Sequence, residues 1–237
     1  MTTTFYDMDA GILASDSRWS AVLCERVVFL DDTGFDKIEI AKGHAFLFAG
    51  DAKRIQEWKS WMHLADVASQ PEPEKSGIAL LVVECATGVV KFAFGYQSEV
   101  ERTLYAGSGG LYASRCWIGN KCAQKAVRTA SSFDLLSGGD GKFLELATQK
   151  HNLMNTTSVD ELHKNFIEKG TVMYAHTDLM VSVKAAAAND PIVQTLVDKI
   201  ASGQLSVSAP CAAMHQEWTD ADKSRLSDAL DDIFARR

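Results

Sequence analysis

Short runs of apolar residues separated by turns fill the first half of the chain, which is typical of β-strands rather than of long helices. Strands are predicted at residues 2–8, 11–16, 37–41, 44–49, 78–85, 89–94 and 103–106. Tight turns at residues 42–43 (Lys-Gly) and 86–88 (Ala-Thr-Gly) join neighbouring runs. Because such short turns connect antiparallel strands, we expect hairpins instead of parallel strand–helix–strand units.

Three helices are predicted within this same half. One follows Gly50, where Asp51 can cap it and apolar residues recur at helical spacing. Two more are expected between Gly109-Gly110 and about residue 132, and Asn120 is expected to cap the second of them.

The last hundred residues are predicted to be mainly helical. A capping-box pattern begins at Ser158, Asp190-Pro191 starts a second helix that Gly203 stops, and Thr219 caps a terminal helix with one apolar stripe. Hairpins followed by helices suit antiparallel sheets with helices layered outside them, an α+β sandwich.

Composition narrows the range of functions. The chain has 237 residues, a net charge of −7 and 46% hydrophobic residues, which fits a globular protein. An acidic chain lacks the basic face that nucleic acids and anionic membranes require, so neither is an expected partner. The longest strongly apolar run, residues 78–83, is far shorter than the roughly 20 residues of a membrane span. The first basic residue is Arg18, so no secretory signal is predicted.

The cysteines and histidines show no ligand-like spacing. The five cysteines include no Cys-x-x-Cys pair, and scattered thiols in an odd number favour a reduced, cytoplasmic protein. The six histidines form no metal-spaced pair, and the glycine-rich turns lack the lysine of a nucleotide-binding loop. We therefore expect neither a metal nor another cofactor.

Thr2 is the first candidate for chemistry. A hydroxyl needs a base to act as a nucleophile at neutral pH, and an amino-terminal threonine carries one, its own α-amine with an ordinary pKa of about 7.7–8.0. The requirement is removal of Met1, which a small second residue permits. Because many proteins begin Met-Thr, the pattern gains weight only from other segments.

Five such segments follow in order: ASDSR at 14–18, DKIEI at 36–40, FAGD at 48–51, AGSGG at 106–110 and SFDLLSGG at 132–139. In this order they resemble the proteasome β-subunit family, which includes bacterial HslV and the Anbu and betaproteobacterial proteasome homologue (BPH) groups. The resemblance covers about residues 2–140. It implies a single domain over residues 1–237, a four-layer αββα sandwich of the N-terminal nucleophile hydrolase class. A helical extension over about residues 150–237 lies outside the matching part.

The resemblance also implies roles for individual residues. Thr2 is the expected nucleophile, and Asp16 pairs with Lys37, whose ammonium favours loss of the hydroxyl proton and keeps the α-amine neutral. Gly50 is the expected oxyanion donor at a helix amino terminus. The remaining catalytic residues, expected to hold the α-amine and a water, are Ser108, Asp134 and Ser137.

Substrate contacts are implied next to the nucleophile. Ser20, Gly50 and Ala52 fall where the family binds the substrate backbone as an added strand. Phe48 falls near the base of the side-chain pocket and Trp19 near its rim. The expected function is a threonine endopeptidase that forms an acyl ester on Thr2. It would act inside a homo-oligomeric ring on peptides or unfolded chains, with a separate ATP-dependent unfoldase as a possible partner.

Alternatives remain at this point. Taken singly, Asp16 can close a turn, Lys37 can be solvated, and the glycines can serve tight turns. The sequence separation between Thr2 and Asp16 is about two residues shorter than in the usual family pattern. The stretch from residue 18 to residue 36 is several residues longer than usual. The same fold without peptidase activity, as a ring scaffold or binding protein, is one alternative. A small-molecule amidase is the other.

Overall fold

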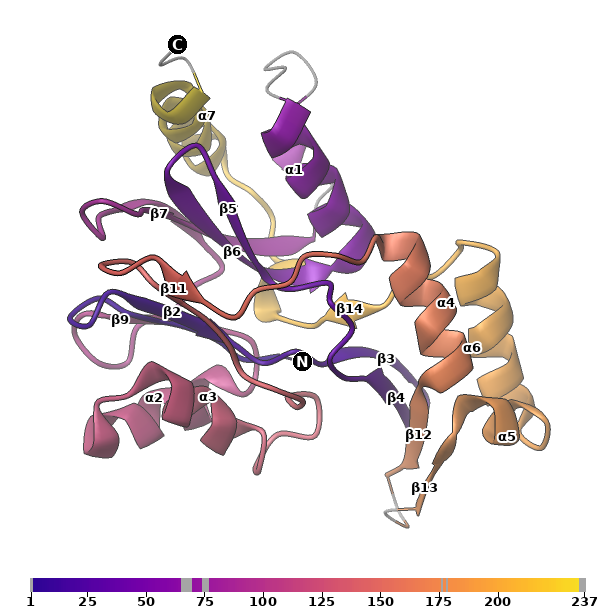
Figure 1. Ribbon diagram of the computed structural model, residues 1–237. Coiled ribbons are helices and arrows are strands. Elements are labelled where there is room, and N and C mark those ends of the chain that lie inside the picture. Colours follow the sequence, from indigo (N-terminus) through magenta and orange to yellow (C-terminus); the bar gives the residue numbers. More distant parts are fainter. Residues whose placement is uncertain (1, 65–69, 74–76, 176, 178, 235–237) are drawn as a thin grey trace.

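Two antiparallel β-sheets stack on each other at the centre of the molecule, and helices cover both outer faces (Figure 1). The structure, a computed structural model, describes residues 2–64, 70–73, 77–175, 177 and 179–234. The layers run helices, sheet, sheet, helices, which confirms the expected α+β sandwich.

The first sheet holds the amino-terminal strand in its interior. Among the described residues it has five strands, in the order β11 (Lys150–His151), β10 (Lys142–Glu145), β2 (Ile12–Ser15), β1 (Thr4–Asp7) and β9 (Thr103–Ala106). Every pairing in it is antiparallel. Because β1 is hydrogen-bonded to β2 on one side and β9 on the other, the residues just before it are held in place.

The second sheet is larger and receives strands from both halves of the chain. In the described part of the chain its order is β13 (Leu179–Ser182), β12 (Thr171–Tyr174), β4 (Arg26–Leu30), β3 (Trp19–Leu23), β14 (Ser208–Ala209), β6 (His44–Asp51), β7 (Ile78–Glu84) and β8 (Val90–Phe94). A further strand, β5 (Ile38–Ala41), also pairs with β6. The two-residue strand β14 therefore separates β3 from β6.

The space between the sheets is filled by apolar side chains. Side chains alternate between the two faces of a strand, so every second residue of each sheet points into this layer. Fully buried residues that meet there are Tyr6, Leu13 and Leu144 from the first sheet and Ile38, Leu47 and Leu81 from the second. This layer holds β1 against β6, and β2 and β10 against β5, across the sandwich.

Helices complete the outer layers (Figure 1). α2 (Gly110–Asn120) and α3 (Ala123–Ala130) cover the first sheet through an alanine-rich face that packs on Phe5. α1 (Ala52–Leu64) and α7 (Asp220–Phe234) cover the second sheet, and Trp61 contacts Phe234 with ring centroids 4.7 Å apart. The helices α4 (Val159–Lys169), α5 (Val183–Ala187) and α6 (Pro191–Ala201) pack together beside β3, β4 and β12.

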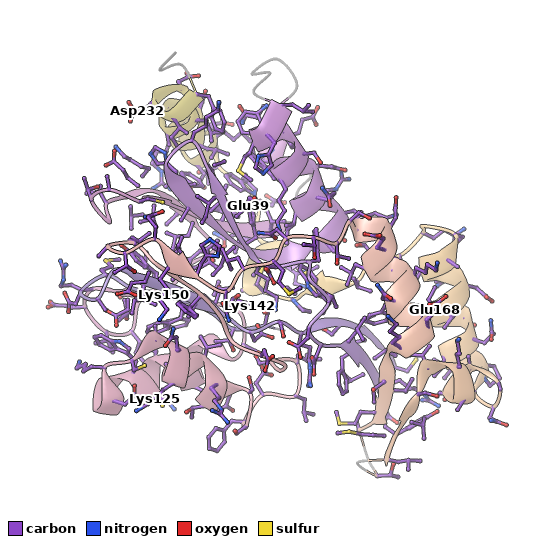
Figure 2. All side chains as sticks on the ribbon, in the orientation of Figure 1. Glu39, Lys125, Lys142, Lys150, Glu168 and Asp232 are labelled. Carbon is purple, nitrogen blue, oxygen red and sulfur yellow. The ribbon has the colours of Figure 1, made fainter. Side chains whose placement is uncertain are left out.

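Some charged side chains lie at the surface, and others are buried between the elements of the sandwich. Lys150 is exposed, whereas Glu39 and Lys142 are buried between elements; Figure 2 labels all three. Glu39 lies 3.4 Å from the buried ammonium of Lys59, and Lys142 lies 3.9 Å from Asp36. A buried charge is costly without a partner. The first pair joins β5 to α1, and the second joins the residues just before β5 to β10.

The predicted helix starts are largely confirmed. Asp51 caps α1 by accepting the Arg54 N–H at 3.0 Å, Ser158 forms the expected capping box, and Asp190 accepts the Ile192 N–H ahead of Pro191. Thr219 accepts the Asp222 N–H at 3.1 Å at the start of α7.

Other expectations need correction. Asn120 ends α2 instead of capping α3, since its side-chain oxygen accepts the N–H of Cys122, the residue that precedes α3. The carboxy-terminal part is not only helical, because strands β10 to β14 come from residues 142–209 and join the same two sheets. Residues 19–30 form the β3–β4 hairpin, which the apolar pattern of the sequence did not predict.

The layer between the sheets should carry much of the stability of the fold. We expect Leu81→Ala to lower the free energy of unfolding by about 2–5 kcal/mol, because it opens a cavity at a fully buried position. Leu135→Ala, whose side chain is 55% exposed, should change it by no more than about 0.5 kcal/mol. Urea unfolding followed by circular dichroism measures both, and equal losses would contradict this assignment of the core.

Candidate functional site

The register of β1 brings three distant segments to the amino terminus. Thr4 pairs with Ser15 of β2 and with Ala106 of β9. Asp16 and Gly107 directly follow those partners, so each flanks the residues ahead of Thr4. The Asp16 N–H accordingly donates to the Thr3 carbonyl at 3.0 Å.

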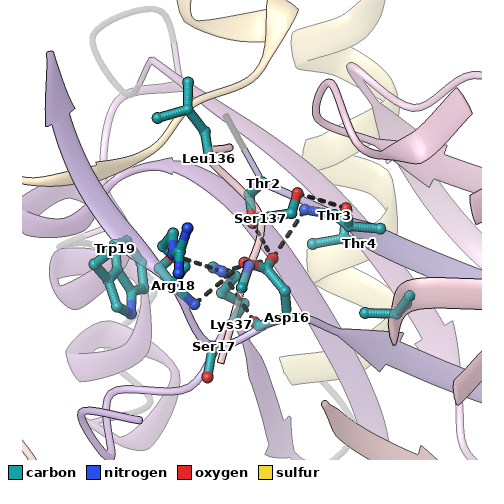
Figure 3. Close-up of polar contacts among 12 residues, drawn as sticks. Thr2, Thr3, Thr4, Asp16, Ser17, Arg18, Trp19, Lys37, Leu136 and Ser137 are labelled. Carbon is teal, nitrogen blue, oxygen red and sulfur yellow. Dashed lines mark hydrogen bonds and ion pairs between the residues drawn. The ribbon is translucent and has the colours of Figure 1, made fainter. Parts of the chain in front are cut away.

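Thr2, Asp16 and Lys37 meet in a buried cluster (Figure 3). The Thr2 hydroxyl donates to Oδ1 of Asp16 at 2.5 Å. Nζ of Lys37 donates to the same oxygen at 2.8 Å. The shorter first hairpin therefore does not separate Thr2 from the charged pair, and the three residues expected to cooperate lie together.

The Asp16 carboxylate is fully satisfied by hydrogen bonds. Besides Thr2 and Lys37, its Oδ1 accepts the Thr3 N–H at 2.8 Å. Its Oδ2 accepts the N–H groups of Gly138 at 3.1 Å and Arg18 at 3.2 Å. Five donors therefore surround the carboxylate, and both of its oxygens are engaged.

Lys37 is equally constrained. Its side chain has no exposed surface, and Nζ donates to the Asp16 carbonyl, Asp16 Oδ1 and the Arg18 carbonyl at 2.8–2.9 Å. Burial lowers the pKa of Lys37 below its ordinary value of 10.5, while the Asp16 carboxylate acts in the opposite direction. All three N–H donors of the ammonium point to acceptors, so the geometry fits the charged form.

A second network supports the adjacent Thr3. Oδ2 of Asp134 accepts the hydroxyls of Ser108 at 2.7 Å and Ser137 at 2.6 Å. Oγ of Ser137 lies 2.7 Å from Oγ1 of Thr3. The three predicted residues are thus joined to each other and reach the amino terminus through Thr3. Their expected contact with an α-amine stays a prediction, because Met1 lies outside the described residues.

Two glycines allow this close approach. A Cβ on Gly107 would lie 1.9 Å from the Thr2 carbonyl oxygen, and one on Gly109 would lie 1.9 Å from Oγ1 of Thr3 and 2.5 Å from Oγ of Ser137. The Gly109 N–H also donates to the Thr2 carbonyl at 3.3 Å. The turn at residues 107–110 therefore packs directly on the amino terminus, which requires residues without a side chain.

The residues expected to bind a substrate backbone surround β14. Ser20 pairs with Ser208, Gly50 pairs with Ala209, and Ala52 donates its N–H to the Val207 carbonyl at 3.1 Å. The Gly50 backbone has φ 129°, and a Cβ there would lie 2.4 Å from the Gly77 carbonyl oxygen, so glycine is required. The use of its N–H as an oxyanion donor stays a prediction.

The two aromatic residues assigned to a side-chain pocket lie in the core. Phe48 has no exposed surface and stacks on Phe46 with ring centroids 6.5 Å apart. Trp19 is also fully buried and donates its ring N–H to the Phe35 carbonyl at 2.8 Å. The rim role of Trp19 is wrong, since a rim needs exposed surface. The role of Phe48 as a pocket base stays untested.

Three contributors to the site were missed from the sequence. Thr3 links Ser137 to β1, the Gly138 N–H binds Asp16, and β14 fills the gap beside Gly50. The run of three threonines at residues 2–4 was an available signal for Thr3. The two-residue strand β14 carries too short a pattern to be recognised.

The described parts of the chain were compared with the residue groups that hold a metal ion and with the helices that span a membrane. Within residues 2–64, 70–73, 77–175, 177 and 179–234, no three His, Cys, Asp or Glu side chains are grouped to hold a metal ion. Across the same residues, no helix combines the length and apolar character of a membrane span.

Comparisons with known proteins give structural similarity only. No protein-family model and no curated protein matches the sequence. The fold is similar to eukaryotic HslV from Trypanosoma brucei, with 18% identity and a TM-score of 0.39 over 60% of this chain and 97% of that one. It is also similar to Thiobacillus denitrificans BPH in complex with epoxomicin, with 15% identity and a TM-score of 0.38 over 62% and 99%. These two chains come from the HslV and BPH groups that the sequence motifs resemble.

Proposed function

We propose that this protein is a threonine-type amide hydrolase, an endopeptidase whose nucleophile is the Thr2 hydroxyl after removal of Met1. The observation that carries the proposal is the meeting of the Thr2 hydroxyl and the Lys37 ammonium on one oxygen of Asp16, with all three side chains buried. A hydroxyl beside a buried cation loses its proton more readily than one in water.

The α-amine of Thr2 is the base in this proposal. Asp16 is a weak candidate, because its carboxylate already binds two backbone N–H groups through Oδ2 and the Lys37 ammonium through Oδ1. An amine on residue 2 itself lies next to the hydroxyl by covalent geometry. The positive charge of Lys37 disfavours a second positive charge nearby and so keeps this amine neutral.

The reaction runs in two halves. The Thr2 hydroxyl passes its proton to the α-amine as Oγ1 bonds to the substrate carbonyl carbon. The resulting ammonium then protonates the leaving amine as the C–N bond breaks, which leaves an acyl ester on Thr2. A water gives a proton to the amine and attacks the ester, and the proton returns to Oγ1 as the acid leaves. In our proposal the Gly50 N–H stabilises the oxyanion, a type of contact worth about 2.7–4 kcal/mol in other enzymes.

Assembly into a homo-oligomeric ring is part of the proposal. A chamber formed by such a ring would keep the active sites away from folded proteins and admit peptides or unfolded chains. A separate ATP-dependent unfoldase would then supply substrate. Thr2 is fully buried, so access of a large substrate to its hydroxyl is restricted. The two alternatives are therefore an inactive scaffold and an amidase for small molecules. Comparing a panel of peptides with small acyl amides would separate an amidase from an endopeptidase.

The nucleophile can be tested with epoxomicin, the compound bound to BPH. Its epoxide and ketone are two electrophilic sites, so a hydroxyl and an amine on one residue can react with it together. We expect an adduct on Thr2 in chains that have lost Met1, found by intact mass and peptide mapping. Thr2→Ala should give no adduct and should lower peptide hydrolysis at least ~10³-fold.

Two controls accompany this measurement. Thr2→Ser keeps a hydroxyl beside the amine and should retain both labelling and hydrolysis. Chains that keep Met1 should remain unlabelled, since their residue 2 has an amide in place of an amine. Hydrolysis that persists in Thr2→Ala would refute the mechanism.

Gly109 should position the nucleophile. Gly109→Ala places a methyl group against Thr3 and Ser137, so we expect at least ~10²-fold slower labelling of Thr2 because small misplacements cost this much. Gly119→Ala is the matched control, since a Cβ there meets nothing within 4 Å and alanine suits the helix interior. The measurement compares the labelling rates of the Gly109→Ala and Gly119→Ala variants at equal folded fraction. Similar rates would show that this turn does not hold the site.

The pH profile should report Lys37. The proposal needs its ammonium, which burial disfavours, so kcat/KM should fall as pH rises through a pKa lowered from 10.5. Asp16→Asn removes the negative charge that favours the ammonium, so this alkaline decline should move to lower pH. Asp140→Asn, at an exposed carboxylate, should leave it in place. A decline that does not move in Asp16→Asn would contradict the role of Lys37, provided circular dichroism shows folded protein throughout.

A further inference from the structure

The gap between β3 and β6, which we call the strand slot, is occupied by the chain's own residues 206–209. β14 pairs antiparallel with β3 on one side, Ser208 with Ser20, and with β6 on the other, Ser208 with Asp51 and Ala209 with Gly50. In Figure 1, β14 has the colour of the carboxy-terminal part of the chain, whereas β3 and β6 have the colours of the amino-terminal part. The occupant thus comes from the carboxy-terminal third of the chain and the slot from the amino-terminal quarter.

The contacts of residues 206–208 use the groups that an added strand would use. The Ala52 N–H donates to the Val207 carbonyl at 3.1 Å, and the Lys53 N–H donates to Oγ of Ser206 at 3.3 Å. These are N–H groups of the first turn of α1, which have no partner inside the helix. Ser20 and Ser208 also exchange longer hydroxyl-to-carbonyl contacts of 3.4–3.5 Å.

Without β14, both walls of the slot would present backbone groups that lack partners, an arrangement that binds an extended peptide from two sides. Buried backbone groups are costly when unsatisfied, so a strand in the slot stabilises the fold relative to an empty slot. The occupant ends at Pro210, which has no N–H and cannot continue the pairing.

The same segment runs on toward the nucleophile. Cys211 lines a cavity of about 300 Å³ together with Gly107 and Ser108, the turn that packs on Thr2. Residues 206–211 therefore extend from the start of α1, past Gly50, to the turn that holds the amino terminus. Substrate that reaches Thr2 by the strand slot must replace this segment.

The segment lies between two helices and is not part of either one. It belongs to a connection of residues 202–219 between α6 and α7, whose regular structure is limited to β14 and a 3-10 helix at Ala212–His215. Its anchors are the fully buried Val207 and Ala209, and its paired side chains are small. A small set of contacts thus determines how much of the folded protein has residues 206–209 in the slot.

We infer that residues 206–209 are an intramolecular inhibitor that occupies the peptide-binding slot and must be displaced before an extended peptide binds. The inference rests on the proposed function for its consequence on catalysis, whereas occupancy of the slot is tested through binding. Peptides with small side chains at the paired positions, as in Ser208 and Ala209, are the ligands that fit this slot.

The test uses full-length protein carrying Thr2→Ala, so that no bound peptide is consumed. The probe is a fluorescein-labelled synthetic peptide with the sequence of residues 204–210, followed by fluorescence anisotropy. Ser208→Pro removes an N–H from the paired strand and should raise the population of the vacant slot. Since apparent affinity scales with the binding-competent fraction, we expect at least ~10-fold tighter binding than to the parent.

Glu217→Pro is the matched control in the same connection. Glu217 is exposed, and Gln216 before it has φ −99° and ψ 130°, which suits a residue preceding proline. This variant should bind the peptide as weakly as the parent does. A scrambled peptide of the same composition should bind neither variant tightly.

Val207→Ala gives a second variant in case Ser208→Pro fails to fold. It loosens a fully buried anchor without a backbone change, so it should also bind the peptide more tightly than the parent. If the folded variants at positions 207 and 208 bind no better than Glu217→Pro, the inference is overturned.

Failure of the inference can be told apart from failure of the proposed function. In chains that keep Thr2, epoxomicin labelling should accelerate with Ser208→Pro and not with Glu217→Pro. Tighter peptide binding with no labelling of Thr2 in any variant supports the inhibitory strand and refutes the nucleophile. Labelling without any gain in binding or rate refutes the inhibitory strand.

Discussion

The buried ion pair between Asp16 and Lys37 is the constraint on which the site depends. A lysine with no exposed surface loses its hydration, and burial lowers its pKa. Three acceptors, two from Asp16 and one from the Arg18 carbonyl, offset that loss. Removing either partner would leave an unpaired buried charge, which typically costs 3–5 kcal/mol. Thr2 therefore meets a rigid, charged environment because the fold itself needs the pair.

The carboxylate of Asp16 also joins separate parts of the chain. It binds the backbone of Thr3 ahead of β1, the backbone of Gly138 after α3, and Lys37 at the start of β5. Thr3 precedes a strand of the first sheet, Lys37 precedes a strand of the second, and Gly138 lies in the connection between α3 and β10. One side chain thus couples the register of β1 to the stacking of the sheets. Errors in either would move the Thr2 hydroxyl away from Lys37.

Sequence patterns were sufficient where they were local or rigidly spaced. The hairpins, the caps at Asp51, Ser158 and Asp190, and the grouping of Thr2, Asp16 and Lys37 were predictable, because turn chemistry and an ordered motif specify them. Strands β10 to β13 were not, since short runs of two to four residues carry little periodicity and form by pairing with distant strands. The burial of Trp19 also depends on the β3–β4 hairpin, which no turn signal marked.

The strand in the slot and the charge in the site are physically connected. Lys37 donates to the Arg18 carbonyl and lies 5.5 Å from the Trp19 ring, at the start of the same strand β3 whose next residue, Ser20, pairs with β14. Filling the slot keeps water from this end of β3, and low hydration strengthens every charge interaction there. Under the proposed function, an empty slot would admit water and weaken the influence of Lys37 on Thr2 until a ligand fills it. Under the proposed function, a bound peptide would restore the dry environment while it delivers the bond to be cut. Occupancy by substrate, rather than mere absence of the inhibitor, would then make Thr2 most reactive.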